Sequence, residues 1–196
     1  MKKLIVLSVF LVISILGIVF GYENLKMDEF FENNIDLDIP LLNSDQPVVS
    51  TVMTIGKPYE DKGVNIAVDF YDPTKENQEK SIIVIDKTYI PNKGVLYKNS
   101  TDFDVLAIYD GTVMEVSKDD LTGNYVRINH NNDLVATYKI IDDIQVKKGD
   151  TVKKGDRIGI SSTSEIAAGH LLLLELQSKS VNVNPEEYYN KTIKEI

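Results

Sequence analysis

The chain has 196 residues, 43% of them hydrophobic, a length that accommodates one domain with a substantial core plus additional segments. Its 21 basic and 30 acidic residues give a net charge of −9, which excludes electrostatic attraction to nucleic acid or to anionic cell-wall polymers. Zero cysteines exclude disulfides, thiolate metal sites and cysteine nucleophiles, and two histidines, His130 and His170, make up the imidazole inventory.

The first 22 residues predict a membrane anchor. A basic start at 1–3 precedes an uncharged run of 19 residues at 4–22. As a helix this run spans roughly 28 Å, close to the hydrocarbon thickness, whereas the apolar core of a cleavable signal peptide has about 7–15 residues. We therefore expect one uncleaved transmembrane helix, with the lysines of the start in the cytoplasm and the rest outside. Gly17 and Gly21 form a small-xxx-small pair, which leaves dimerisation of the anchors open.

Residues 23–50 predict an acidic linker, because they carry charges, asparagines and prolines without hydrophobic periodicity. Without the two lysines of the cytoplasmic start, 19 basic residues remain against 30 acidic ones, so the part outside the membrane has a net charge of −11. We expect this segment to hold a domain at 51–190 away from the membrane, followed by a tail at 191–196.

The segment 51–190 predicts a mainly β domain. Short runs rich in Val, Ile, Tyr and Thr alternate with Gly, Asn and Asp, and they lie at 81–86, 103–116, 124–140 and 170–183. Alternation within the third run turns Val126 and Ile128 inward. Residues 130–133 read as a hairpin turn, which makes His130 a polar turn residue rather than a ligand. The stretch 72–81 has a helical composition and predicts one short surface helix.

A repeated motif, "VKKGDTVKKGDRIG" at 146–159, predicts two tight reversals. Gly149 and Gly155 would supply positive φ, with branched residues buried between the turns. Biotinyl and lipoyl carriers have such a double turn, but neither the Met-Lys-Met nor the Asp-Lys-Ala of their modified lysine occurs in this sequence. The motif therefore favours a different class of protein.

Residues 90–188 resemble the lysostaphin-like, or LytM-type, zinc metallopeptidases, which cut peptide cross-links in peptidoglycan. The matching segments are, in chain order, "NKGVLY", "VLAIYDGTV", "NYVRINHNNDLVATY", the double turn, "GHLLLLEL" and "NPEEYY". Gly169 and Glu175 stand at the two ends of the family's Gly-x-His-Leu-His-Phe-Glu motif. The resemblance implies a LytM-type antiparallel β-sheet domain.

By the same resemblance, the residues that carry the family's chemistry are replaced. The positions of its zinc ligands and catalytic histidines hold Asn92, Leu96, Ile140, Leu171 and Leu173. A catalytic zinc needs three nitrogen or oxygen donors and an open position, and leucine and isoleucine offer no lone pair. We therefore expect no catalytic residue, no metal, no cofactor and no enzymatic activity.

His170 stands next to the former metal positions but does not replace them. Along a strand, successive side chains point to opposite faces, which turns His170 away from Leu171 and Leu173. A one-residue slip would turn the whole strand over, and a buried face prevents this. We expect the two leucines to have become core, each burial contributing roughly 1.5–3 kcal/mol.

The upstream segment at 68–94 resembles the sporulation branch of this family, through its Tyr-Asp start, its expected Gln-Glu helix and its Thr-Tyr-x-Pro-Asn-x-Gly end. This resemblance implies a scaffold of the forespore membrane that binds the mother-cell stage III sporulation protein AH across the intermembrane space. Such a pair supports engulfment and a channel between the two cells, with a ring of higher order as one form of assembly. The alternative function is a regulator or binder of peptidoglycan or of amidases. The sequence identifies neither the partner-binding surface nor the stoichiometry, and leaves open whether the groove still holds peptide.

Overall fold

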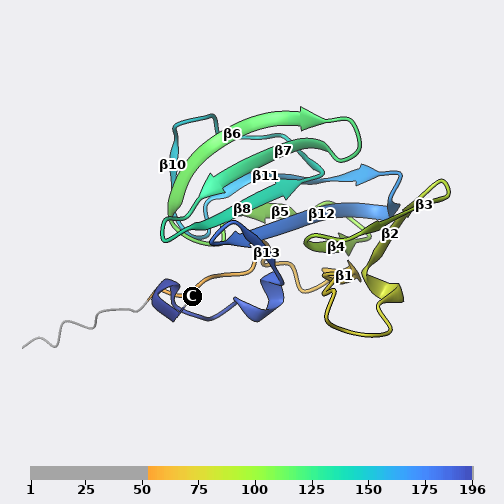
Figure 1. Ribbon diagram of the computed structural model, residues 1–196. Coiled ribbons are helices and arrows are strands. Elements are labelled where there is room, and N and C mark those ends of the chain that lie inside the picture. Colours follow the sequence, from red (N-terminus) through yellow and green to blue (C-terminus); the bar gives the residue numbers. More distant parts are fainter. Residues whose placement is uncertain (1–52, 196) are drawn as a thin grey trace, which may run out of the picture. The chain divides into compact units, whose positions relative to one another are not determined.

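The computed structural model describes residues 53–195, which form an antiparallel β-structure (Figure 1). The main sheet has the strand order β1-β4-β12-β8-β7-β6-β10. Its strands are β1 (Asn65–Val68), β4 (Val95–Asn99), β6 (Gly111–Asp119), β7 (Gly123–Asn129), β8 (Leu134–Lys139), β10 (Thr151–Val152) and β12 (Ala167–Ser178). The prediction of a mainly β, antiparallel domain is confirmed.

Four further strands join this sheet from the side. They are β5 (Asp104–Leu106), β9 (Ile141–Asp142), β11 (Arg157–Ser164) and β13 (Val181–Val183). Strand β11 pairs with β12, β5 and β9, and β13 pairs with β12. Two 3₁₀ turns, η2 (Pro185–Glu187) and η3 (Ile193–Glu195), follow near the carboxyl end.

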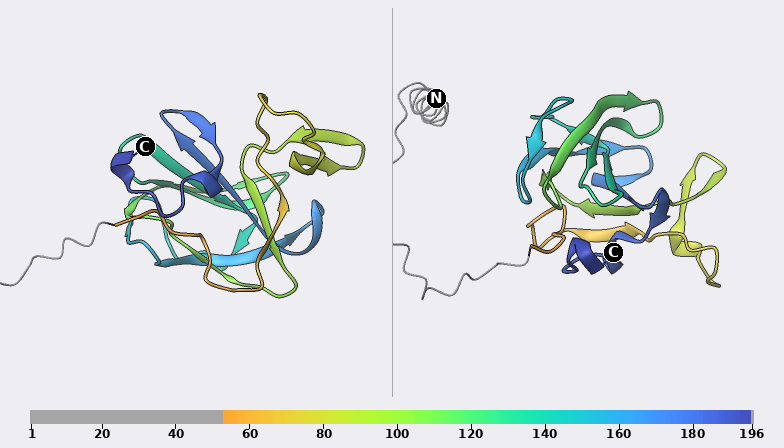
Figure 2. Two further views of the ribbon diagram at one scale, coloured as in Figure 1. Left: turned by 90° about the horizontal axis from the view of Figure 1, so that it is seen from below. Right: turned by 60° about the vertical axis from the view of Figure 1, so that its left-hand side comes forward.

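A separate hairpin, β2 (Ile82–Ile85) and β3 (Thr88–Pro91), stands away from the main sheet beside β1 and β4 (Figures 1 and 2). Its two strands pair with each other alone within the described sheets. Val84 and Tyr89 are cross-strand neighbours, and both are exposed. The hairpin therefore adds a projecting arm to the domain.

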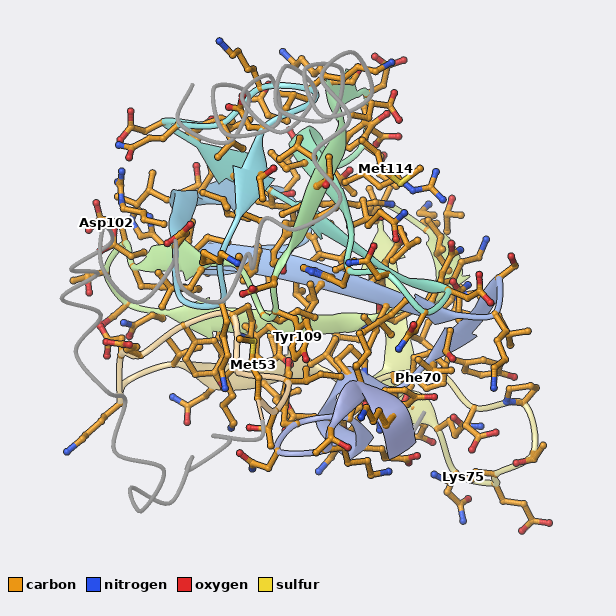
Figure 3. All side chains as sticks on the ribbon, turned by 90° about the vertical axis from the view of Figure 1, so that its left-hand side faces the viewer. Met53, Phe70, Lys75, Asp102, Tyr109 and Met114 are labelled. Carbon is orange, nitrogen blue, oxygen red and sulfur yellow. The ribbon has the colours of Figure 1, made fainter. Side chains whose placement is uncertain are left out.

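One face of the main sheet carries the core. Val126 and Ile128 of β7 are fully buried, which confirms the predicted alternation, and in the ladder they pair with Tyr138 and Ala136 of β8. These side chains pack in one cluster with buried residues of β5, β9 and β11, so the added strands cover this face. Phe70 and other partly buried side chains pack against its margin (Figure 3).

The short helix predicted at 72–81 is barely present, since the structure has there only a 3₁₀ turn, η1 (Glu79–Ser81). The segment folds instead around its own polar side chains. Asp72 accepts hydrogen bonds from the backbone N–H and hydroxyl of Thr74, and the Gln78 side chain bonds both the N–H and the carbonyl of Asp72. Such side-chain bonds compete with the helical ladder, and the segment has no apolar stripe to bury.

The double turn forms as predicted. Gly149 and Gly155 have φ of 92° and 86°. In each reversal the aspartate that follows the glycine accepts a hydrogen bond from a lysine N–H three residues earlier, Lys147 in one turn and Lys153 in the other. Positive φ at the third position of such a turn favours glycine, which explains the repeated Gly-Asp.

The predicted anchor at 4–22 and linker at 23–50 lie outside the described residues. Within 53–195, no helix combines the length and hydropathy needed to cross a bilayer.

Candidate functional site

The strand that carries Leu171 and Leu173 is β12, which lies between β4 and β8 in the main sheet. Its alternation is the predicted one, because Leu172 and Leu174 belong to the main core, whereas Leu171 and Leu173 belong to a second, smaller cluster. His170 pairs with Asn99 of β4 at the start of this ladder. It is partly buried, and its Nδ1 has no hydrogen-bond partner among the described residues.

Four of the five sequence-predicted positions meet in that second cluster. Its buried members are Leu96, Ile140, Leu171 and Leu173, each between 0 and 3% exposed. Leu96 and Leu173 are direct neighbours across the ladder of β4 and β12. Residues from two distant segments pack over this cluster, namely Ala67, Val68, Ile166 and Ala167. We call these buried and covering side chains together the apolar plug.

Asn92, the fifth position, is buried but holds a different place. Its amide Nδ2 donates to the carbonyl oxygens of Val68 and Asp69 at 3.2 and 3.0 Å, and its Oδ1 accepts from the N–H of Gly94 at 3.3 Å. The side chain thus ties the end of β1 onto the plug. The resemblance implied that Asn92 stands at a ligand position. Its tether could not be read from the sequence, because its partners lie more than twenty residues upstream.

The donor set at this site does not fit a zinc ion. The plug presents carbon atoms alone, and the oxygen of Asn92 is engaged by a backbone N–H. No group of three or more His, Cys, Asp or Glu side chains within residues 53–195 is placed to hold a metal. A hydrolytic zinc needs three such donors around an open position, so the geometry offers no step through a metal-bound water.

Ile140 has an unusual backbone at the edge of the plug. Its φ is 62°, a left-handed conformation that is rare and strained for a β-branched residue. Its N–H donates to the carbonyl of Thr122 at 3.1 Å, and its carbonyl accepts from the N–H of Ser162 at 3.0 Å. The strained peptide therefore joins the turn between β6 and β7 to strand β11.

A cavity of about 400 Å³ lies beside the plug. Its walls come from the β2–β3 hairpin, the β6–β7 turn, the β8–β9 junction and the β11–β12 turn. The apolar lining consists of Ile85, Leu121, Ile140, Ile141 and Ile166, and the charged lining of Lys118, Asp120, Asp142 and Glu165. Sequence reasoning did not identify this cavity, because its walls come from four separate segments.

Glu175, the motif's terminal glutamate, occupies the open face of β12. Its carboxylate lies 2.8 Å from Nζ of Lys139 on β8, and about one fifth of each side chain is exposed. Arg127 of β7 contacts Gln177 on the same side at 3.4 Å. Next to the plug, this face of β12 therefore carries polar side chains, and the carboxylate of Glu175 is already bound in an ion pair with Lys139.

His130 lies at the β7–β8 turn, as predicted, yet it is fully buried rather than exposed. Its Nδ1 is 3.1 Å from the carbonyl oxygen of Asp110, and its Nε2 has no partner among the described residues. Burial lowers the pKa of this imidazole to about 4. The side chain is thus held neutral, away from the plug's residues.

The chain is similar to a known protein family and to one of the curated sporulation proteins. Residues 90–185 match the model of peptidase family M23. Stage II sporulation protein Q of Bacillus subtilis (strain 168) is 29% identical over 143 residues, which cover 70% of this chain and 50% of that protein. The chain therefore spans half the length of that curated relative.

Two solved structures extend the comparison. The SpoIIQ–SpoIIIAH pore-forming complex matches with a TM-score of 0.68 and 27% identity, over 74% of this chain and 96% of the matched chain. A zinc-containing peptidase from Vibrio cholerae matches with a TM-score of 0.55 and 26% identity, over 67% of this chain and 39% of that one. The resemblance inferred from the sequence is confirmed: residues 90–185 match the model of peptidase family M23, and the chain is similar to stage II sporulation protein Q.

Proposed function

We propose that this chain is a non-enzymatic scaffold of the forespore membrane. It binds the ectodomain of a SpoIIIAH-type protein of the mother cell across the intermembrane space. In this role it supports engulfment and a channel between the two cells. The rigid β domain is presented to the partner by the acidic linker at 23–50 and retained by the anchor at 4–22.

The observation that carries this proposal is the apolar plug. Four residues that by resemblance stand at positions of catalytic chemistry in the zinc peptidases are buried carbon side chains, covered by β1 and the β11–β12 turn. A peptidase of this class needs an accessible, metal-binding groove at that place. A fold that keeps its sheet while its metal positions pack as core supports binding rather than hydrolysis.

The comparisons support the choice of partner. The matched solved structures include complexes of SpoIIQ with SpoIIIAH. Among the curated relatives, the peptidases match over 42–52% of this chain, against 70% for stage II sporulation protein Q. The strongly acidic part outside the membrane also disfavours attraction to anionic wall polymers.

The test is a binding titration. The full-length chain, purified in mild detergent, is titrated by calorimetry with the SpoIIIAH ectodomain of the same organism. We expect saturable binding with a defined stoichiometry. A parallel sedimentation assay with purified peptidoglycan sacculi is expected to leave the chain in solution. Absence of SpoIIIAH binding together with co-sedimentation would replace the scaffold by a wall-binding regulator.

A further inference from the structure

We propose that the cavity beside the apolar plug is the pocket in which the protein partner docks. Its occupant is an apolar side chain on a partner segment that carries basic residues on its flanks. This inference rests on the proposed function and names the surface of this chain that performs it.

The apolar lining converges from separate elements. Ile85 comes from the β2–β3 hairpin, Leu121 from the β6–β7 turn, and Ile166 from the β11–β12 turn. Leu121 is 47% exposed although it is a large aliphatic residue. An anchor side chain of a partner can contact these three apolar residues at once, and it contributes most to affinity where surrounding groups exclude water from the contact.

The pocket has a fixed frame. The backbone of Ile140 bonds to Thr122 on one wall and to Ser162 on the other, and its φ of 62° keeps the peptide in a conformation that costs free energy. Ile140 is also part of the plug, so the pocket floor is continuous with packed core. A preformed pocket lowers the entropy lost on binding.

The charge of the rim selects the partner. Asp120, Asp142 and Glu165 outnumber Lys118, which leaves the lining two charges negative. None of these three carboxylates belongs to an ion pair found in the part of the chain that the structure describes. Asp142 accepts hydrogen bonds from neutral groups, the hydroxyl of Ser162 and the amide of Asn124. Lysine or arginine beside the anchor side chain would complement this rim.

The absence of cysteine from the sequence permits a sharp test. Leu121→Cys in the full-length chain places one thiol at the pocket, and a bulky maleimide attached after folding blocks it. Val181→Cys is the matched control. Val181 is 64% exposed on β13, which pairs with the end of β12 that neighbours the β7–β8 turn, at the opposite end of β7 from Leu121.

Binding of the SpoIIIAH ectodomain is measured before and after labelling. We expect the unlabelled Leu121→Cys chain to bind more weakly than wild type, because a smaller side chain lines the pocket, and labelling to weaken its binding at least tenfold further. Labelling of the Val181→Cys chain should change it less than twofold. Equal binding by labelled Leu121→Cys and wild-type chains would overturn the pocket while leaving the scaffold function intact. If the wild-type chain itself fails to bind, the proposed function fails first.

The charge argument has its own pair of variants. Glu165→Lys is expected to weaken SpoIIIAH binding about threefold or more, because it turns the acidic rim towards neutrality. Glu187→Lys, at another exposed glutamate, which lies on η2 and 3.9 Å from Lys75, should leave the affinity unchanged. Tighter binding by Glu165→Lys would contradict a basic flank on the partner. Protection of the thiol of Leu121→Cys from maleimide by soluble muropeptides would instead assign the pocket to a wall ligand and overturn the proposal.

Discussion

His130 couples the stability of the domain to pH. The buried imidazole has a pKa of about 4, with desolvation as the main cause, whereas an unfolded chain titrates near 6.5. Between these values the unfolded state binds more protons than the folded one. The contribution of neutral His130 is therefore complete above pH 6.5 and is lost as the pH falls towards 4. We expect the free energy of unfolding to fall by about 3 kcal/mol over this window, measured by urea denaturation.

The control is His130→Gln, which cannot titrate. Its unfolding free energy should be lower at pH 7 but nearly flat between pH 6.5 and 4.5. Asp110, whose pKa is lowered chiefly by its hydrogen bond from Lys153, loses its contribution as the pH falls below the usual carboxyl value of 3.8, outside this window. An unchanged slope in His130→Gln would assign the pH dependence to other groups.

The plug leucines predict that histidines alone will not restore a metal site. In Leu171→His/Leu173→His, two imidazoles enter a place that is at most 3% exposed and has no described polar partner. We expect destabilisation by roughly 3–6 kcal/mol in total, from unpaired buried polar groups and lost burial. Zinc should stay below one ion per chain and no muropeptides should be released, because Leu96 offers no donor and the oxygen of Asn92 is engaged.

Leu171→Met/Leu173→Met serves as the matched control, since it changes the shape of the cluster without adding a strongly polar group. The methionine variant should lower the free energy of unfolding by less than about 1.5 kcal/mol per site. Stoichiometric zinc in the histidine variant, or muropeptide release abolished by a chelator, would show that the site retains more of the family's ligand geometry than the plug indicates.

At the scale of elements, β1 packs over the apolar plug, and the side chain of Asn92 holds its end there through hydrogen bonds. Removing the Asn92 amide leaves the carbonyls of Val68 and Asp69 without this donor. We expect Asn92→Ala to lower the free energy of unfolding by about 1–3 kcal/mol. Hydrogen exchange should quicken mainly at β1 and at the bonds beside it, such as Asp69 N–H to Lys80.

Asn99→Ala provides the comparison, because its amide bonds Asp61 and Ser100 at the surface. Asn99→Ala should lower the free energy of unfolding by less than about 0.5 kcal/mol. A uniform rise in exchange across the whole domain in Asn92→Ala would mean that the amide stabilises the global fold and does not specifically hold the cover.

Elements whose signals are local could be predicted from the sequence. The alternation of side chains predicted the inward face of Val126 and Ile128, which are buried. The repeated Lys-Lys-Gly-Asp predicted turns with positive φ at Gly149 and Gly155, which the structure has. The composition of the stretch at 72–81 predicted a helix. In the structure the side chain of Gln78 instead forms hydrogen bonds with the backbone of its own loop. Composition does not record such side-chain competition.

The site was predicted in part for the same physical reason. Leu171 and Leu173 were expected to become core, and they pack with Leu96 and Ile140. The cover by β1 and the cavity walls depend on contacts between distant segments, which no local pattern encodes. His130 shows the same limit of local patterns. Its place at a turn was predicted correctly, but its complete burial was not, because its contact is with Asp110, twenty residues earlier.

Residues 23–196 carry a net charge of −11, and the proposed docking pocket is lined in part by apolar side chains. These two features predict different responses to salt. Long-range attraction between an acidic surface and a basic partner is screened, because the Debye length shortens from roughly 14 Å at 0.05 M to roughly 4 Å at 0.5 M. Burial of an apolar side chain is little affected by this screening, since it depends on area removed from water.

We therefore expect the dissociation constant for the SpoIIIAH ectodomain to rise by less than about tenfold between 0.05 and 0.5 M salt. The charged rim should appear mainly in the association rate, which falls with salt, whereas the dissociation rate should stay nearly constant because the apolar anchor sets it. Surface plasmon resonance with the full-length chain in detergent separates the two rates. A dissociation constant that rises a hundredfold or more would make the contact chiefly electrostatic, and the apolar side chains of the pocket would then no longer explain the affinity.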